Sequence, residues 1–160
     1  ATGAALRGEL HPAGRIGMER SKVVIHHRLQ HQAVALRDVL EGGGHAVELA
    51  ESFPDVLQLL RAEDVSVLVC NYHGTQDCIR MMAMVRQRFS DVARLLLVKD
   101  PDRDFAQRAL DSDLIHHFVC LPVSQESLVD TVDALKDWSG RQNRTSHLWD
   151  GDTITTPAPA

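Results

Sequence analysis

The stretch "KVVIHHRLQHQAVALRDVLEGGG", residues 22–44, decides the fold. It opens on a short apolar run, and four apolar side chains then recur at spacings of four, three and four residues: Leu29, Ala33, Leu36 and Leu40. That spacing is typical of a helix with one buried face, and the glycines at 42–44 stop it. We interpret the stretch as a β-strand followed by an α-helix. His26 and His27 then stand where the strand ends.

The same alternation continues outward along the chain. Four further strand-like runs each precede a segment with helical spacing: "HAVELA", "VSVLVC", "ARLLLV" and "IHHFVC". Ser52 is a plausible N-cap with Pro54 in the first turn that follows it, and Ser124 caps the last helix, which ends near Trp138. "VSVLVC" is continuously apolar, as a strand covered on both faces must be. Five strand–helix units predict a single α/β domain built on a doubly wound, five-stranded parallel sheet.

Composition excludes several classes of partner. The chain has 160 residues, 44% of them hydrophobic, which suits one domain. A formal charge of −5 without basic runs excludes nucleic acid as a partner of this domain. The apolar runs are far shorter than the roughly 20 residues that span a bilayer, so we expect no membrane partner. Cys70, Cys78 and Cys120 form no CxxC pair, and we interpret them as reduced thiols of a cytoplasmic protein.

The two ends of the chain differ in composition from the middle. Residues 1–20 mix Gly, Pro, Ala and Arg without a stable period, which predicts a disordered leader or a cloning remnant. Residues 139–160 are polar and finish in a Pro/Ala tail, which predicts a linker or disordered tail. The predicted domain therefore comprises residues 21–138.

Five residues stand at the predicted carboxyl ends of the strands. Such sheets bind their ligands at that edge, where the strand order reverses. We therefore expect the residues that end the first, third, fourth and fifth strands to converge there: His26, His27, Asn71, Lys99 and Leu121.

The segment from Lys22 to about Trp138 resembles the receiver domain of bacterial two-component response regulators. The resemblance lies in the order and lengths of the predicted strands and helices and in the residues of three segments: "RDVLEGGGHAVELAES", "DPDRDFAQRALDSDLIHHF" and "LPVSQESLVDTVDALK". It implies a CheY-like, flavodoxin-like sheet in the order 2-1-3-4-5 with a phosphorylation pocket at the strand ends. In that family two acids after the first strand hold Mg²⁺ and an Asp ending the third strand accepts the phosphoryl group. A Thr or Ser ends the fourth strand, and a Lys before a Pro ends the fifth.

All five pocket positions depart from that pattern. The acid pair falls on His26 and His27, the phospho-acceptor on Asn71, the hydroxyl residue on Lys99, and the Lys of the Lys-Pro pair on Leu121. The resemblance therefore implies a degenerate pseudo-receiver that lacks the phospho-acceptor Asp.

Outside the pocket, the sequence retains residues that are typical of the receiver scaffold. Phe118 matches the aromatic switch position on the fifth strand, and Leu121–Pro122 falls where the family has a cis peptide.

Elementary chemistry supports the loss of phosphorylation independently of the family. Phosphoryl transfer to a carboxylate needs an ionised acid and a divalent cation. Asn71 is a poor nucleophile, and imidazole suits Zn, Cu or Ni better than Mg²⁺. We therefore expect no catalytic residue, no enzymatic activity and no cofactor.

Three functions remain on this architecture. The first is a phosphorylation-independent interaction module of a response regulator, which forms a homodimer or binds an output or partner signalling protein through the fourth helix, fifth strand and fifth helix. The alternative is a sensor that binds a metal or small ligand with His26, His27 and His73, although consecutive strand residues point to opposite faces. The third, a flavodoxin-like enzyme, lacks a glycine-rich phosphate loop in "HHRLQH".

Several other residues receive structural interpretations. His116 and His117 are predicted to be surface or strand-edge residues. The methionines in "MMAM", Met81, Met82 and Met84, have two interpretations: an adaptable binding surface, or core filler, which their helical spacing favours. Lys99 has two possible roles: to pair with Asp100 or Asn71, or to extend into water.

Overall fold

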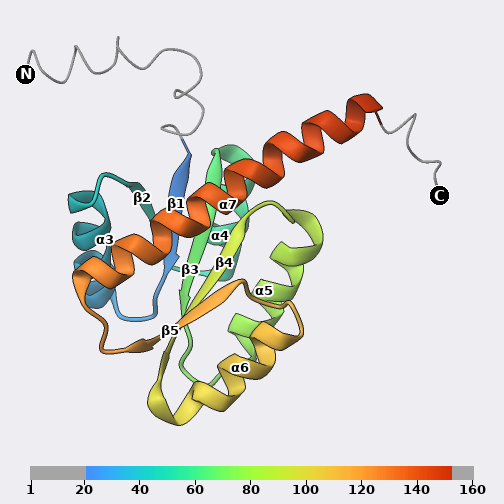
Figure 1. Ribbon diagram of the computed structural model, residues 1–160. Coiled ribbons are helices and arrows are strands. Elements are labelled where there is room, and N and C mark those ends of the chain that lie inside the picture. The colour runs from blue at the N-terminus through green and yellow to red at the C-terminus, as the bar shows by residue number, and fades with distance from the viewer. Residues whose placement is uncertain (1–20, 153–160) are drawn as a thin grey trace, which may run out of the picture.

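The computed structural model describes residues 21–152, with side chains up to residue 142. One parallel sheet has the strand order β2-β1-β3-β4-β5, which confirms the expected topology (Figure 1). Its strands are β1 (Lys22–His26), β2 (Ala46–Ala50), β3 (Val65–Asn71), β4 (Ala93–Lys99) and β5 (His117–Leu121). The helices between and after them are α3 (Gln30–Gly42), α4 (Phe53–Ala62), α5 (Gln76–Arg88), the short 3-10 helix η1 (Asp100–Asp102), α6 (Arg103–Asp111) and α7 (Gln125–Asp152).

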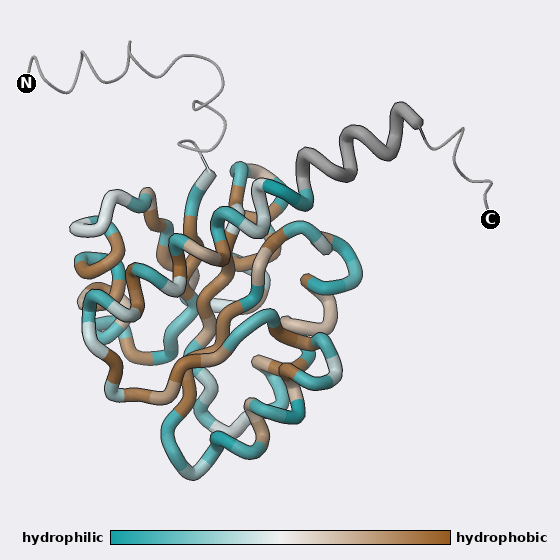
Figure 2. The backbone as a smooth tube through the Cα atoms, viewed as in Figure 1, coloured by the Kyte–Doolittle hydropathy of each residue, from teal (hydrophilic) through white to brown (hydrophobic). Residues whose placement is uncertain are grey.

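Helices cover both faces of the sheet, so the central strands β3 and β4 are buried on both faces and mostly apolar. Residues that alternate along a strand point to opposite faces. One set packs with α3 and α7 around Ile25, Leu40 and Leu95. The other packs with α4, α5 and α6 around Val56, Leu68, Met82 and Leu96. Figure 2 shows the hydrophobic residues along the strands and the hydrophilic ones over the outer helices.

Local signals in the sequence start the helices at the predicted places. The Ser52 hydroxyl accepts a hydrogen bond from the backbone N–H of Asp55 at 3.2 Å, which caps α4. The Ser124 hydroxyl accepts one from the N–H of Ser127 at 3.0 Å at the start of α7. Each such cap stabilises its helix by about 1 kcal/mol.

The last helix is longer than the sequence pattern predicts. Helix α7 continues past Trp138 to Asp152, so residues 139–152 of the predicted linker are helical. Those residues carry no apolar stripe, and periodicity therefore gave no sign of a helix. Buried Ser139 donates a hydrogen bond to the backbone oxygen of Asp91 at 2.5 Å, which holds the helix beyond Trp138.

The predicted leader, residues 1–20, and the last part of the predicted tail, residues 153–160, lie outside the described residues. In the described part, no helix combines the length and apolar character that crossing a bilayer requires.

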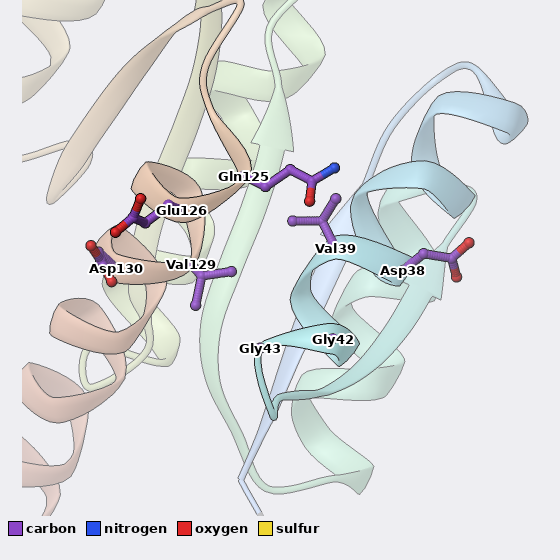
Figure 3. Close-up of a pocket in the computed structure, with 8 residues that line it drawn as sticks. All are labelled: Asp38, Val39, Gly42, Gly43, Gln125, Glu126, Val129 and Asp130. Carbon is purple, nitrogen blue, oxygen red and sulfur yellow. The ribbon is translucent and has the colours of Figure 1, made fainter.

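Close approach of α3 and α7 depends on a glycine. A Cβ placed on Gly43 would lie 2.7 Å from Cγ1 of Val129, closer than atoms of two packed side chains come. The backbone of Gly43, with φ −90°, would accept other residues, so only space demands glycine here. Both residues line an open groove of about 350 Å³ between α3 and α7 (Figure 3).

A buried arginine holds the turn between α6 and β5. Arg94 on β4 is only 3% exposed, and its guanidinium donates hydrogen bonds to the backbone oxygens of Leu114 (2.7 Å), Asp113 (3.1 Å) and Val92 (3.4 Å). Burial, and then repulsion from Arg86, lower the pKa of Arg94 to about 10. Asp113 has a positive φ of 64°, so the arginine stabilises a turn of unusual backbone geometry.

His116, predicted to lie at the surface or the strand edge, is half-buried. Its Nδ1 accepts a hydrogen bond from the backbone N–H of Arg94 at 2.9 Å, and its ring packs on Trp138 with centroids 4.1 Å apart. Burial, and then Arg94, lower the pKa of His116 to about 4. The covering ring comes from α7, which strand periodicity cannot reveal. His117 is exposed, in agreement with the prediction.

Candidate functional site

A cavity of about 330 Å³ opens at the carboxyl edge of the sheet, beside the ends of β1, β2 and β3. Parallel sheets of this kind bind their ligands at that edge. Histidines, acids and a thiol gather in it, with one arginine and four smaller or apolar side chains. The lining residues are His26, Arg28, Glu51, Ser52, Phe53, His73, Thr75, Asp77, Cys78 and Met81.

His26 and His73 are the imidazoles of the cavity. His26 ends β1 on the face that packs with α4 and α5, and its Nδ1 lies 3.9 Å from Sγ of Cys70. Burial, and then the nearby His73, lower the pKa of His26, so its ring is neutral at pH 7. Nδ1 of His73 and Oγ1 of Thr75 are buried without a hydrogen-bond partner among the described residues. The cavity therefore has polar groups available to a ligand.

His27 leaves β1 on the other side, as strand alternation predicts. It is 7% exposed, and its Nδ1 accepts the backbone N–H of Leu29 at 3.0 Å. Burial is also the main reason that the pKa of His27 is lowered. The three histidines of the metal alternative are thus divided between the cavity and the loop into α3. Among the described residues, no three His, Cys, Asp or Glu side chains are arranged to hold a metal ion.

Asn71, Lys99 and Leu121 lie at the same edge, but they do not line this cavity. Asn71 pairs with Leu97 across β3 and β4, and Lys99 pairs with Leu121 across β4 and β5. Their positions along the strands match those of Val69, Leu97 and Val119, whose side chains face α3 and α7. Of the five residues expected to converge, only His26 lines the cavity.

Lys99 extends outward from its strand. Its side chain is exposed and pairs with none of the side chains that the structure describes. The carboxylate of Asp100 instead accepts a hydrogen bond from Arg103 at 3.1 Å. The alternative of a lysine that extends into water is therefore the one observed.

Leu121 packs against the core beneath α3 and α7, and the Leu121–Pro122 peptide, whose isomer the sequence left open, is cis. Phe118 is half-buried on the opposite face, against the core beneath α4, α5 and α6. Its role as an aromatic switch remains a prediction.

Sequence reasoning missed one contact. Sγ of Cys70 lies 3.0 Å from Sγ of Cys78, and both thiols are free and buried. The hydrogen bond with Cys78, and then burial, raise the pKa of Cys70. The two residues are eight apart, so a search for CxxC spacing does not find them. The available signal was topological, because the end of a strand lies beside the first turn of the helix that follows it.

Comparison with known proteins identifies the fold. No family model and no curated protein matches the sequence. A crystal structure of an adenylate cyclase from Rhodopirellula baltica aligns with a TM-score of 0.74 at 15% sequence identity, over 82% of this chain and 98% of that one.

Receiver domains align comparably well. The signal receiver domain of an HD-domain-containing protein from Pseudomonas fluorescens Pf-5 gives a TM-score of 0.70 at 18% identity, over 79% of this chain and 93% of that one. A response regulator receiver domain from Clostridium thermocellum gives 0.66 at 15%, over 78% and 98%. At such identities the likeness concerns the fold, and the chain has the CheY-like fold of response regulator receiver domains.

Proposed function

We propose that the chain is a non-enzymatic, receiver-like signalling module that works without phosphorylation. The observation that carries this proposal is the pair of side chains at the ends of β1 and β3: a histidine, His26, and an amide, Asn71. In a receiver these strand ends hold the metal-binding acids and the phosphorylated Asp. Here neither side chain offers the carboxylate that the reaction consumes.

The other positions of the expected pocket offer no replacement for the missing parts. Phosphoryl transfer needs a cation that neutralises the phosphate oxygens, and Mg²⁺ takes oxygen ligands. His26 is a neutral nitrogen base, and His27 is engaged with its own loop. Lys99 extends into water and Leu121 packs in the core, so neither is held ready to bind a phosphoryl group.

We expect the purified chain to be inert to small phosphodonors. Incubation with acetyl phosphate and Mg²⁺, followed by intact-mass spectrometry, should show no added phosphoryl group, because no activated carboxylate stands at the end of β3. A phosphorylatable receiver domain in the same tube is the control. Stoichiometric phosphorylation of Asp77 or Glu51, the carboxylates at the cavity, would refute phosphorylation independence.

Such a module acts by binding a partner, and we propose that its binding surface lies on α6, β5 and α7. β5 is an edge strand whose residues are exposed or half-buried, so this edge is open to a partner. Two copies related by a two-fold axis would bury it in a closed dimer.

Light scattering over a concentration series should detect this dimer. Arg108→Glu reverses an exposed charge on α6 and makes the proposed interface more negative on both copies of an already acidic chain. It should weaken dimerisation about tenfold, since like charges repel across an interface. Arg61→Glu makes the same change on α4, far from β5 in the sheet order, and should leave the dimer intact. A strict monomer at every concentration would rule out the homodimer.

A further inference from the structure

Two thiols lie within reach of a covalent bond beneath the strand-end cavity. Cys70 on β3 is 0% exposed and Cys78 in the first turn of α5 is 4% exposed. Their sulfur atoms are 3.0 Å apart. A disulfide bond is about 2.05 Å long, so an approach of about 1 Å joins them. The thiol contact joins the end of a strand to the start of the helix that follows it.

The cavity gives small molecules a route to one of these thiols. Cys78 lines it together with His26 and His73, whereas Cys70 is not among the lining residues. A cavity of about 330 Å³ is ample for a molecule of the size of hydrogen peroxide. The two cysteines therefore differ in access, Cys78 at the wall of the cavity and Cys70 behind it.

We propose that Cys70 and Cys78 are a modification site for peroxides, which convert the pair into an intramolecular disulfide. Peroxide oxidises the Cys78 thiol to a sulfenic acid and is itself reduced to one molecule of water. The sulfur of Cys70 then attacks the sulfur of Cys78, forms the S–S bond and displaces hydroxide, which leaves as a second water. Two thiols lose two electrons in total, and one peroxide gains them.

His26 is placed to assist the second step. The Cys70 thiol must lose its proton as it attacks, and its raised pKa disfavours that loss. Nδ1 of His26 lies 3.9 Å from Sγ of Cys70, and the lowered pKa of His26 leaves its ring neutral. With the ring proton on Nε2, Nδ1 is able to accept the proton of the thiol. His26 then passes this proton to the departing hydroxide.

Oxidation would change the loop that carries the polar residues of the site. A Cys70–Cys78 bond ties the end of β3 to the first turn of α5 and closes the loop 71–77, which holds His73 and Thr75 of the cavity. Such a bond would give the domain a chemical switch that does not involve a phosphoryl group. The disulfide chemistry holds whether or not the domain is a signalling module, since it rests only on the thiol geometry.

The test is peroxide treatment of the reduced 160-residue chain, followed by alkylation with N-ethylmaleimide under denaturing conditions and intact-mass measurement. The wild type should lose about 2 Da and keep one alkylatable thiol, because two thiols give up a hydrogen each. Cys120→Ser, the control at the third cysteine, should form the same disulfide and keep none. Cys70→Ser should stop at a sulfenic acid on Cys78 that dimedone traps.

His26→Gln tests the histidine separately. We expect disulfide closure to slow about tenfold or more, as loss of a general base does. Phenylarsine oxide, which needs two adjacent thiols, should bind the variant as it binds the wild type, which shows that the pair is still assembled. An unchanged closure rate would remove His26 from the mechanism. Three alkylatable thiols in the wild type after peroxide, or a disulfide that includes Cys120 or a second chain, would overturn the proposed site.

Discussion

Arg94→Met should lower the free energy of unfolding by about 3 kcal/mol, since it leaves three buried or partly buried backbone carbonyls without their donor. The guanidinium of Arg94 donates to Leu114, Asp113 and Val92, and the residue is almost completely buried. Methionine fills similar volume and keeps the apolar contacts, so the loss reports the hydrogen bonds. Urea denaturation followed by circular dichroism measures it.

A neighbouring arginine provides the matched control. Arg86 also donates to the same turn, from Nη1 to the backbone oxygen of Ser112 at 3.1 Å, but it is exposed. Water replaces the donor when Arg86 is removed, so Arg86→Met should cost no more than about 0.5 kcal/mol. Arg94→Lys should recover only part of the loss, because one ammonium cannot match the planar fork of the guanidinium. Equal losses for the two methionine variants would show that burial of Arg94 contributes nothing.

The elements with local signals were predictable from the sequence. The caps at Ser52 and Ser124 depend on hydrogen bonds to backbone groups three residues away, so the sequence around them is sufficient. Strand β3 is mostly apolar because both of its faces are buried, and that apolar run identified it in the sequence. The order of the strands came from the resemblance to receivers, because strand patterns alone do not determine which strands are neighbours.

The features that were missed depend on contacts between distant segments. His116 becomes half-buried because Trp138, on a different element, covers its ring. Cys70 and Cys78 meet because β3 and α5 converge, although their spacing in the sequence matches no thiol motif. Helix α7 extends past Trp138 through residues without an apolar face, where periodicity has nothing to detect.

Within the candidate site, sequence reasoning identified the residues but only part of their arrangement. Alternation along β1 correctly separates His26 from His27. The same alternation puts Asn71, Lys99 and Leu121 on the α3 and α7 face, the side on which His27 leaves β1, and that consequence became visible only with the strand register. The cavity thus combines one predicted pocket residue with the loops that follow β2 and β3.

Asn71→Asp alone should not make the chain phosphorylatable, although it supplies the missing nucleophile. His26 and His27 still provide no oxygen ligand for Mg²⁺, and without the cation the phosphate oxygens repel the new carboxylate. Acetyl phosphate and Mg²⁺ should leave the intact mass of this variant unchanged. Phosphorylation of the Asn71→Asp variant would show that the reaction does not require the family's residues at the other four positions.

The largest change should come from restoring all five positions at once: His26→Asp, His27→Asp, Asn71→Asp, Lys99→Thr and Leu121→Lys. The backbone can accept an acid at residue 27, because a carboxylate oxygen can replace Nδ1 of His27 as the acceptor of the Leu29 N–H. We expect this variant to bind Mg²⁺ and to gain a phosphoryl group.

The same variant with Asn71→Ala in place of Asn71→Asp keeps two of the three acids that would hold the metal, and it lacks only the nucleophile. Titration calorimetry should therefore still detect Mg²⁺, while mass spectrometry detects no label. Comparison of these two variants separates loss of the cation site from loss of the nucleophile. If the five-fold variant binds Mg²⁺ and stays unlabelled, the block lies in the backbone at the strand ends. In-line attack requires an ionised carboxylate, and it also requires that this carboxylate lie within about 3.5 Å of the phosphorus atom.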